Sequence, residues 1–364
     1  MESNQLLSHS TLGSDLDEKK AGMQTEHTAM VTKFPGVIGT FMGRDALSLA
    51  LISLNLDTRD TVLLPAYTCQ EVLRSFVSKV GVAFYDVRPD LTIDPDEIRS
   101  KLKRGRIGMV LITDYFGFLQ PHRREIRKIC DEQGICLVED CAHSLLTGGA
   151  GEVGDFAIYS FRKILPVPDG GGLRINREGT KVSPEYYPKI YSNALSLTAI
   201  AKSQLNIHTE MLSRARVASH TNYVIANVTA RKGNERILPL SYFAQYGVSK
   251  VSLAEVMRKR REDFQFWSEV SLGNPSLAPV FRELPAEVCP LGFPVKVRER
   301  GSLEARARKA GILLSVHWRL DETLAPECGS SHELSKEMLT LPVYPHLTRK
   351  KREILAAVVI GEGA

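Results

Sequence analysis

An acidic residue and a lysine stand in one segment, residues 138–172, in a pattern suited to covalent amine chemistry. Asp140 ends a short apolar run typical of a buried strand, and Lys163 follows on a stretch bounded by glycine and proline. A lysine amine forms a Schiff base with an aldehyde and then moves protons. A carboxylate keeps a cofactor ring nitrogen protonated. Pyridoxal phosphate (PLP) chemistry needs both groups, so the pattern predicts a PLP site with Lys163 and Asp140 as catalytic residues.

The elements that must position these two groups alternate along the chain. Apolar strands are expected at 61–65, 82–86, 107–113, 135–139, 156–161 and 172–176, and helices at 45–54, 69–80, 94–102 and 121–133. Strands that alternate with helices and are apolar on both faces are typical of a parallel sheet covered on two sides. Ligands bind beyond the carboxyl ends of such strands. Asp114, Asp140 and Ser160 are expected at those ends.

The second half of the chain is less regular. Helices are expected at 187–205 and 248–268, followed by a strand at 291–297, a helix at 302–310, a strand at 312–318 and a helix at 348–359. This pattern predicts a smaller C-terminal α/β domain. We therefore expect an N-terminal tail at 1–35, a large PLP-binding domain at 36–247 and a small domain at 248–364.

Composition narrows the classes of protein. The chain has 364 residues, of which 43% are hydrophobic and 24% charged, and its formal net charge of +5 is too small to argue for nucleic acid. Its six cysteines form no CxxC pair and no cluster with histidine, so no metal site is expected and the thiols are expected to be reduced, as in the cytoplasm. The first thirty residues lack the apolar stretch of a signal peptide, and no run predicts a membrane span.

Several motifs, in order along the chain, resemble the DegT/DnrJ/EryC1/StrS family of PLP-dependent sugar aminotransferases. The resemblance covers roughly residues 36–360. The motifs are Gly43-Arg44-Asp45-Ala46-Leu47, Pro65-Ala66-Tyr67-Thr68, Glu139-Asp140-Cys141-Ala142-His143, Gly154-Asp155 with Ser160-Phe161-Arg162-Lys163 and Gly170-Gly171, Ser315-Val316-His317-Trp318, and Leu341-Pro342-Val343-Tyr344-Pro345.

The resemblance implies a fold, an assembly and a reaction. The fold is the type I, aspartate aminotransferase-like α/β fold, with a large, mixed, mostly parallel sheet and a smaller C-terminal α/β domain. The assembly is a homodimer with the active site at the interface. The reaction moves an amino group from an amino acid, expected to be glutamate, to a keto-sugar that is expected to be nucleotide-linked.

The resemblance also implies residue roles. Lys163 is the Schiff-base lysine and Asp140 binds the pyridine nitrogen. The remaining cofactor and substrate assignments are His143 against the cofactor ring, Ser160 and the backbone N–H groups of Arg44 and Asp45 on the phosphate, Thr68 in the cofactor site, and His317 and Tyr67 near the substrate. The helix start has a physical reason of its own, because free N–H groups at helix N-termini bind anions.

The chain departs from the family pattern in three places. Cys69 stands where an aromatic residue usually stacks on PLP, a position for which Tyr67 could compensate, and only Arg162 separates Ser160-Phe161 from Lys163. Either Asn234 or Arg236 is the candidate for the asparagine that the partner subunit places on the phosphate. Two other functions stay open: a PLP-dependent sugar dehydratase, against which Lys163 argues because family dehydratases have histidine there, and a non-catalytic binding or regulatory protein.

Two further patterns have structural interpretations. The glycine spacing at 149–154 matches a dinucleotide fingerprint but precedes a strand instead of a helix, so we interpret it as a glycine-rich loop. The basic runs at 258–261 and 349–352 are expected to be solvated helix faces.

Overall fold

The structure of the protein is a computed structural model. It describes residues 32–361 except 57, 77–78, 104, 181, 183–184, 209–235, 275 and 346–347. Among the described residues, no helix combines the length and the apolar character needed to cross a bilayer.

A seven-stranded sheet forms the larger body of the molecule. Its strand order is β1-β7-β6-β5-β4-β2-β3; the five strands from β2 to β6 run parallel, and β7 and β1 are antiparallel additions at one edge. The strands are β1 (Val37–Thr40), β2 (Thr61–Pro65), β3 (Gly81–Tyr85), β4 (Ile107–Thr113), β5 (Cys136–Asp140), β6 (Phe156–Ser160) and β7 (Gly171–Ile175). The expected mixed, mostly parallel sheet is therefore present.

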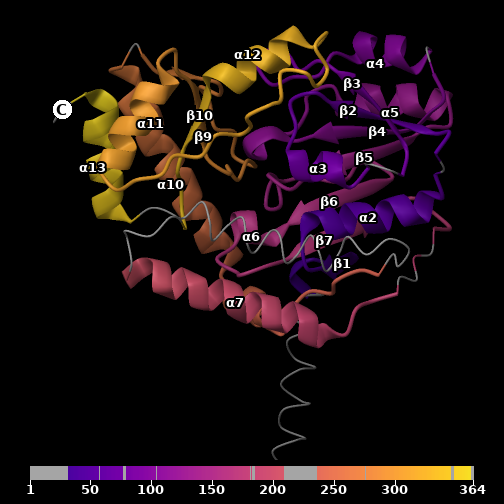
Figure 1. The fold of residues 1–364 in the computed structure, drawn as a ribbon, viewed down its shortest axis with the longest axis horizontal. Coiled ribbons are helices and arrows are strands. Elements are labelled where there is room, and N and C mark those ends of the chain that lie inside the picture. The colour runs from indigo at the N-terminus through magenta and orange to yellow at the C-terminus, as the bar shows by residue number, and fades with distance from the viewer. Residues whose placement is uncertain are drawn as a thin grey trace, which may run out of the picture.

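Helices cover this sheet on both faces because successive strand residues point to opposite sides. Leu63 and Val110 pack into the hydrophobic cluster that contains residues of α4 (Pro95–Leu102) and α5 (Arg123–Glu132). Their neighbours Val62 and Met109 pack into a different cluster with α2 (Gly43–Leu54). The strands are therefore apolar on both faces, as the sequence predicts (Figure 1).

A three-stranded antiparallel sheet forms the core of the C-terminal part. Its order is β10-β9-β8, with β8 (Ala278–Pro279), β9 (Phe293–Lys296) and β10 (Met338–Leu341). Residues of α10 (Leu253–Leu272), α11 (Arg300–Lys309) and α13 (Arg349–Ile360) join one cluster with it, around Trp267 and Phe293. Figure 1 shows this group on the left and the large sheet on the right, with α6 (Phe161–Ile164) between them.

One contact ties the two parts together directly. Asp86 follows β3, and its carboxylate accepts the backbone N–H groups of Ser330 at 3.0 Å and Ser331 at 2.8 Å. Both residues lie at the start of α12 (Gly329–Glu337), where free N–H groups favour a carboxylate.

Several predicted elements differ in the structure. The expected strand at 312–318 is absent, because this segment meets β10 only at one bridge, Ser315 with Thr340, before His317 and Trp318 turn toward the large sheet. The expected helix at 69–80 is only α3 (Gln70–Arg74). The helix expected at 187–205 is present as α7 (Lys189–His208) and the one expected at 248–268 as α10, whereas α9 (Tyr242–Lys250) was not predicted. The domain division at 247/248 stays a prediction.

Candidate active site

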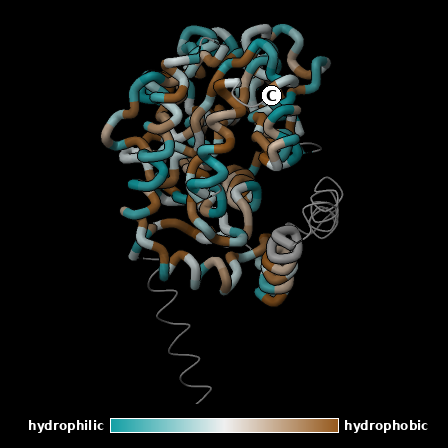
Figure 2. The backbone as a smooth tube through the Cα atoms, turned by 90° about the vertical axis from the view of Figure 1, so that its left-hand side faces the viewer, coloured by the Kyte–Doolittle hydropathy of each residue, from teal (hydrophilic) through white to brown (hydrophobic). Residues whose placement is uncertain are grey.

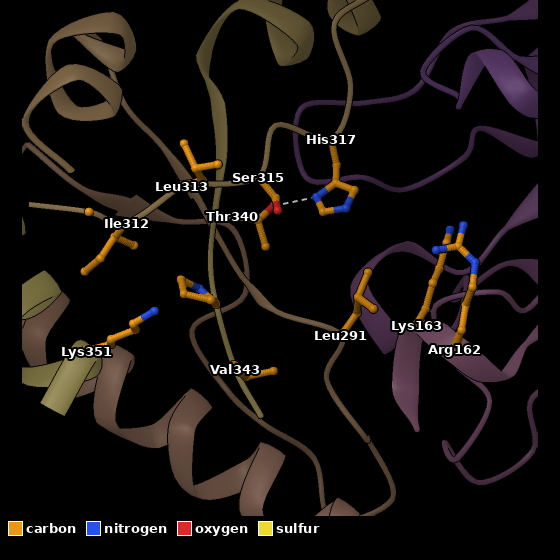
Figure 3. Close-up of a pocket in the computed structure, with 12 residues that line it drawn as sticks. Arg162, Lys163, Leu291, Ile312, Leu313, Ser315, His317, Thr340, Val343 and Lys351 are labelled. Carbon is orange, nitrogen blue, oxygen red and sulfur yellow. Dashed lines mark hydrogen bonds between the residues drawn. The ribbon is translucent and has the colours of Figure 1, made fainter. Parts of the chain in front are cut away.

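Lys163 lies on a short helical turn at the carboxyl edge of the large sheet. The turn α6 begins directly after Ser160 ends β6. The Phe161 N–H donates to the Gly170 carbonyl at 2.9 Å, which closes the turn against β7. The Lys163 side chain is half-buried and lines a cavity of ≈ 500 Å³ between the two sheets (Figure 3).

Asp140 and Lys163 are half-buried groups whose charges act on each other. Asp140 ends β5, next to β6, and its Oδ1 accepts the Ala142 N–H at 3.0 Å. Burial raises the pKa of Asp140, an effect that the Lys163 charge partly offsets. Burial likewise lowers the pKa of Lys163 and Asp140 opposes it. The net lowering favours the uncharged amine, which is the form that acts as nucleophile and base.

His143 lies on the turn that follows Asp140 and is fully buried. Its Nδ1 accepts the Phe116 N–H at 3.3 Å, which leaves the proton on Nε2 of the neutral ring. Burial, and then the charge of Lys163, hold the pKa of His143 well below its usual range. The Trp318 ring stacks on His143, with the centroids 5.4 Å apart. His143 is therefore a fixed neutral donor in this region.

Aromatic residues from both parts of the chain surround His143: His317 and Trp318 come from the C-terminal part, and Tyr67 follows β2 of the large sheet. Nδ1 of His317 lies 2.9 Å from Oγ1 of Thr340 (Figure 3), and burial lowers the pKa of His317 to about 3. Tyr67 packs 5.4 Å from Trp318 between ring centroids. Burial raises the pKa of Tyr67. Its hydroxyl is buried and forms no complete hydrogen bond, although the backbone N–H of Trp318 lies near it. The sequence-predicted His317 and Tyr67 are thus brought to the His143 side.

The start of α2 packs tightly against the end of β6. A Cβ on Gly43 would lie 3.3 Å from the Tyr159 carbonyl and 3.8 Å from Cβ of Ser160. A Cβ on Gly171 would lie 2.2 Å from the carbonyl oxygen of Met42, so only glycine allows this approach. Ser160 makes no capping hydrogen bond to α6. The helix start and the Ser160 hydroxyl therefore lie next to each other, as the phosphate assignment requires.

At the start of α2, Asp45 and Arg44 make different contacts. The Asp45 N–H donates to the Met42 carbonyl at 3.0 Å, and the Asp45 carboxylate accepts the Met42 N–H at 2.8 Å. The Asp45 N–H is therefore engaged within the helix start. The Arg44 guanidinium forms an ion pair with Glu71.

A second guanidinium adds positive charge here. The Arg162 side chain reaches solvent, and its Nε donates to Sδ of Met42 at 3.2 Å. The surrounding protein nevertheless lowers the pKa of Arg162, through desolvation first and then through the charge of Arg44. Two arginines thus share the α2 start, which suits a phosphate dianion.

Thr68 and Cys69 lie on the loop after β2. Thr68 is buried, and its N–H donates to the Ala66 carbonyl at 3.0 Å. Cys69 is half-buried and lies close enough to Lys163 and Arg162 to affect the pKa of both. The loop therefore borders the lysine even though Cys69 offers no ring.

A buried polar cluster supports the turn that holds Asp140 and His143. Oδ1 of Asp114 accepts the Gln120 N–H, and Oδ2 accepts the Ser144 hydroxyl, both at 3.0 Å. Asp114, Glu139 and Cys141 can bring one ligand atom each to within 4.8 Å of one another. The hydrogen bonds on both Asp114 oxygens give this cluster a structural role in fixing the turn.

The expectation of solvated basic faces is wrong for Arg260. Arg260 is fully buried, because it faces α6 and the segment that precedes β9. In the second basic run, Lys351 is exposed as expected and also lines the cavity, opposite Lys163 (Figure 3). Helical spacing turns one residue of a basic run inward while its neighbours remain exposed, which composition alone does not reveal.

Other sequence assignments fall outside the site. Asn234 lies outside the described residues, and Arg236 pairs with Glu185 at 3.1 Å. Trp318, Lys351 and Arg162 belong to this region although the sequence analysis assigned them no role. The Ser315–Trp318 motif was a signal for the first, whereas no sequence signal distinguishes Lys351 from its basic neighbours.

The donor set fits PLP. It combines a lysine amine of lowered pKa, a half-buried carboxylate that acts on it, and a helix start flanked by a serine hydroxyl and two guanidinium groups. These are the groups that hold an aldehyde, a ring nitrogen and a phosphate respectively.

Comparison with known proteins supports the family resemblance. Residues 26–181 match the model of the DegT/DnrJ/EryC1/StrS aminotransferase family. This confirms the resemblance over the part of the chain that contains Asp140 and Lys163.

Two relatives and one solved structure illustrate the likeness. The erythromycin biosynthesis sensory transduction protein EryC1 of Saccharopolyspora erythraea is 21% identical over 87% of this chain and 83% of its own length. The 3-oxo-glucose-6-phosphate:glutamate aminotransferase of Bacillus subtilis is 27% identical over 34% of this chain and 28% of its own length. The PLP form of the putative sugar aminotransferase Spr1654 from Streptococcus pneumoniae aligns with a TM-score of 0.65 at 14% identity, over 93% of this chain and 90% of that one. The last shows that this chain has the predicted fold class.

Asp45 gives a pH test of the buried helix start. Burial raises its pKa from 3.8 to about 7, so the folded state binds a proton that the unfolded state releases. A carboxyl group whose pKa rises on folding stabilises the folded state at pH values below its unfolded-state pKa. This stabilisation is lost as pH rises through its folded-state pKa. Between about pH 5.5 and about pH 8 we expect the wild type to lose about 2 kcal/mol of unfolding free energy relative to Asp45→Asn.

Urea unfolding of the PLP-free protein at several pH values measures this difference. Asp321→Asn is the control, because that carboxylate is exposed and bonds only to its own loop. Parallel pH curves for wild type and Asp45→Asn would contradict the assignment.

Proposed function

We propose that this chain, matched to the DegT/DnrJ/EryC1/StrS aminotransferase family over residues 26–181, is a PLP-dependent aminotransferase that moves an amino group from glutamate to a keto-sugar. One observation carries the proposal. The Lys163 amine and the Asp140 carboxylate lie together at the carboxyl edge of the sheet, and each perturbs the pKa of the other. Perturbed, mutually dependent pKa values of this kind cluster at catalytic sites.

Five residues would hold the cofactor. Lys163 would bind its aldehyde, Asp140 its ring nitrogen, and Ser160 with the Arg44 N–H its phosphate, while His143 would lie against the ring. When bound, PLP supplies the electron sink that stabilises a carbanion at the carbon bearing the amine. Cofactor binding by these residues is supported by the donor set and by the α2 start that Gly171 permits.

The protein's own part in the reaction is proton transfer and orientation. The lowered pKa of Lys163 lets Nζ remove a proton from the donor's α-carbon and return it elsewhere. Neutral His143, with its proton on Nε2, offers a fixed hydrogen-bond donor without adding charge. The aromatic wall at Tyr67 and Trp318 excludes water from this region.

The cavity suits an anionic sugar substrate. Its lining includes Arg162 and Lys351 on opposite sides, with the hydroxyl groups of Ser315 and Thr340 between them (Figure 3). Cations bind phosphate and carboxylate groups, and hydroxyl groups match those of a sugar. A keto-sugar that bears phosphate, as in a nucleotide-linked sugar, fits these groups. Glutamate, which binds in the other half of the reaction, would place a carboxylate on the same cations.

A homodimer is part of the proposal. Four large apolar side chains on and just before α7 are exposed in the single chain: Tyr186, Ile190, Tyr191 and Leu197. Ile190 is 71% exposed. Figure 2 shows this helix at the margin of the molecule with apolar residues along it. Contiguous exposed apolar side chains of this kind mark an association surface.

A cytoplasmic location is also proposed. All six cysteines are unpaired, and five of them are buried. Unpaired thiols persist in a reducing compartment.

Lys163→Ala tests the catalytic assignment. We expect loss of the visible absorbance of lysine-bound PLP and a fall in transamination of about 10³-fold or more, because both the covalent anchor and the base are removed. Lys336→Ala, which removes an exposed lysine, is the control. An unchanged rate would sink the assignment, and PLP binding by the wild type without any transamination would favour the binding-protein alternative.

Lys351→Ala tests anion recognition. We expect KM for a phosphate-bearing keto-sugar to rise about 10-fold with kcat nearly unchanged, since a charged hydrogen bond to bound substrate is lost. Lys350→Ala is the matched control because it is exposed on the same helix and does not line the cavity. Equal KM values for the two variants would remove Lys351 from the substrate site.

Ile190→Glu tests the dimer surface. A carboxylate placed in a buried apolar contact should raise the dimer dissociation constant about 30-fold or more, measured by sedimentation. Leu272→Glu changes an even more exposed apolar residue, 87% exposed, at the end of α10 and should have no effect. A monomeric wild type would exclude the proposed assembly.

A further inference from the structure

Arg260 is a fully buried arginine on α10. Its neighbours in the basic run behave as surface residues: Arg258 pairs with Glu255 and Glu262, and Lys259 pairs with Glu255. No carboxylate forms an ion pair with Arg260 within the part of the chain that the structure describes. A buried charge without a counter-ion is costly, so its hydrogen bonds must compensate.

Backbone carbonyls accept all of these bonds. Nη2 donates to the Lys163 carbonyl at 2.8 Å and to the Ile164 carbonyl at 2.9 Å, and Nε donates to the Ile164 carbonyl at 3.1 Å. Nη1 donates to the Pro290 carbonyl at 3.0 Å and the Leu291 carbonyl at 3.1 Å. One rigid, planar group thus joins two segments that are far apart in the sequence.

The first segment cannot hold itself in place. The helical turn α6 has only four residues, and the carbonyls of a helix end have no partner within the helix. A single turn is also unstable alone, because helix formation needs many residues to repay its nucleation. Arg260 satisfies the carbonyls of Lys163 and of the residue after it, and so fixes the backbone from which the lysine side chain projects.

The second segment leads to the other side of the site. The Leu291 N–H donates to the Phe116 carbonyl at 2.9 Å, and the Phe116 N–H donates to Nδ1 of His143 at 3.3 Å. The side chain of Leu291 also lines the cavity near Lys163 (Figure 3). Arg260 therefore links the lysine turn to Leu291. Leu291 is in turn hydrogen-bonded to Phe116, whose N–H sets the tautomer of His143.

We propose that Arg260 is a positioning residue: it fixes the Lys163 turn relative to Leu291, and thereby to the Phe116–His143 side of the cavity. It does not itself line the cavity. The catalytic consequence rests on the proposed role of Lys163, whereas the effect on the turn does not.

The chemistry of the side chain explains why arginine stands here. A guanidinium presents donors in a fixed plane and reaches two pairs of carbonyls together, whereas an ammonium is a point charge that reaches fewer. Burial lowers the pKa of Arg260 to about 10, which still leaves the group charged at neutral pH.

Hydrogen–deuterium exchange of the PLP-free protein tests the proposal without relying on activity. The variants are Arg260→Lys and Arg260→Ala. The matched control is Arg261→Ala, because Arg261 also donates to backbone carbonyls, of Pro285 at 2.6 Å and Val288 at 2.8 Å, away from the lysine turn. We expect exchange of the amides in 161–167 and 289–292 to rise about 10-fold or more in the Arg260 variants. The amides of β4 should stay unchanged, and Arg261→Ala should leave 161–167 unchanged.

A second readout follows the lysine itself. With PLP added, the pH midpoint of the visible absorbance should shift in Arg260→Lys and not in Arg261→Ala. Unchanged exchange at 161–167 in a folded Arg260 variant would overturn the proposal. Failure of both Arg260 variants to fold would overturn it as well, since Arg260 would then support the whole core rather than this turn. Increased exchange in a protein that proves not to transaminate would retain the positional role and reject only the proposed function.

Discussion

The candidate site depends on one electrostatic constraint: a lysine amine and a carboxylate lie half-buried, and each affects the pKa of the other. Water would stabilise each ion better than a protein interior does, so each group stays in place only if the other, and the surrounding backbone, compensate. Asp140 gains its position from β5 and Lys163 from the turn after β6, and these strands are neighbours in the sheet. The burial that makes the pair costly also lowers the pKa of Lys163, which makes the amine reactive.

The cavity lies where the Lys163 turn faces the C-terminal part of the chain. The large-sheet part supplies Arg162 and Lys163 to its lining, and the C-terminal part supplies His317 and Lys351. Behind the lining, His143 of the first part stacks with Trp318 of the second. Contacts that bridge the two parts include charged side chains bonded to backbone groups, such as Asp86 with the start of α12 and Arg260 with two pairs of carbonyls. Such contacts are directional, so they set the geometry of the gap more closely than apolar packing alone would.

The structure shows what surrounds the residues that depart from the family pattern. Cys69 borders the lysine without offering a ring, while Tyr67 packs with Trp318 on the His143 side. The short stretch between Ser160 and Lys163 folds as a single helical turn, whose carbonyls an external arginine satisfies. Arg162 occupies the space between the turn and the start of α2, where it adds positive charge to the side on which Ser160 lies.

The sequence alone determined the parallel sheet and the placement of Asp140 and Ser160 at strand ends, because alternation of apolar runs and the residues that end them are local properties of the chain. It also indicated the family, through short motifs in order. Tertiary structure decided the features that depend on contacts between distant segments, namely strand pairing and burial. Residues 312–318 have a strand-like composition, yet they pair only once because Trp318 is drawn to the large sheet. The basic run at 258–261 looks uniform, yet packing turned Arg260 alone toward the lysine turn, since burial depends on which face of a helix meets which neighbour.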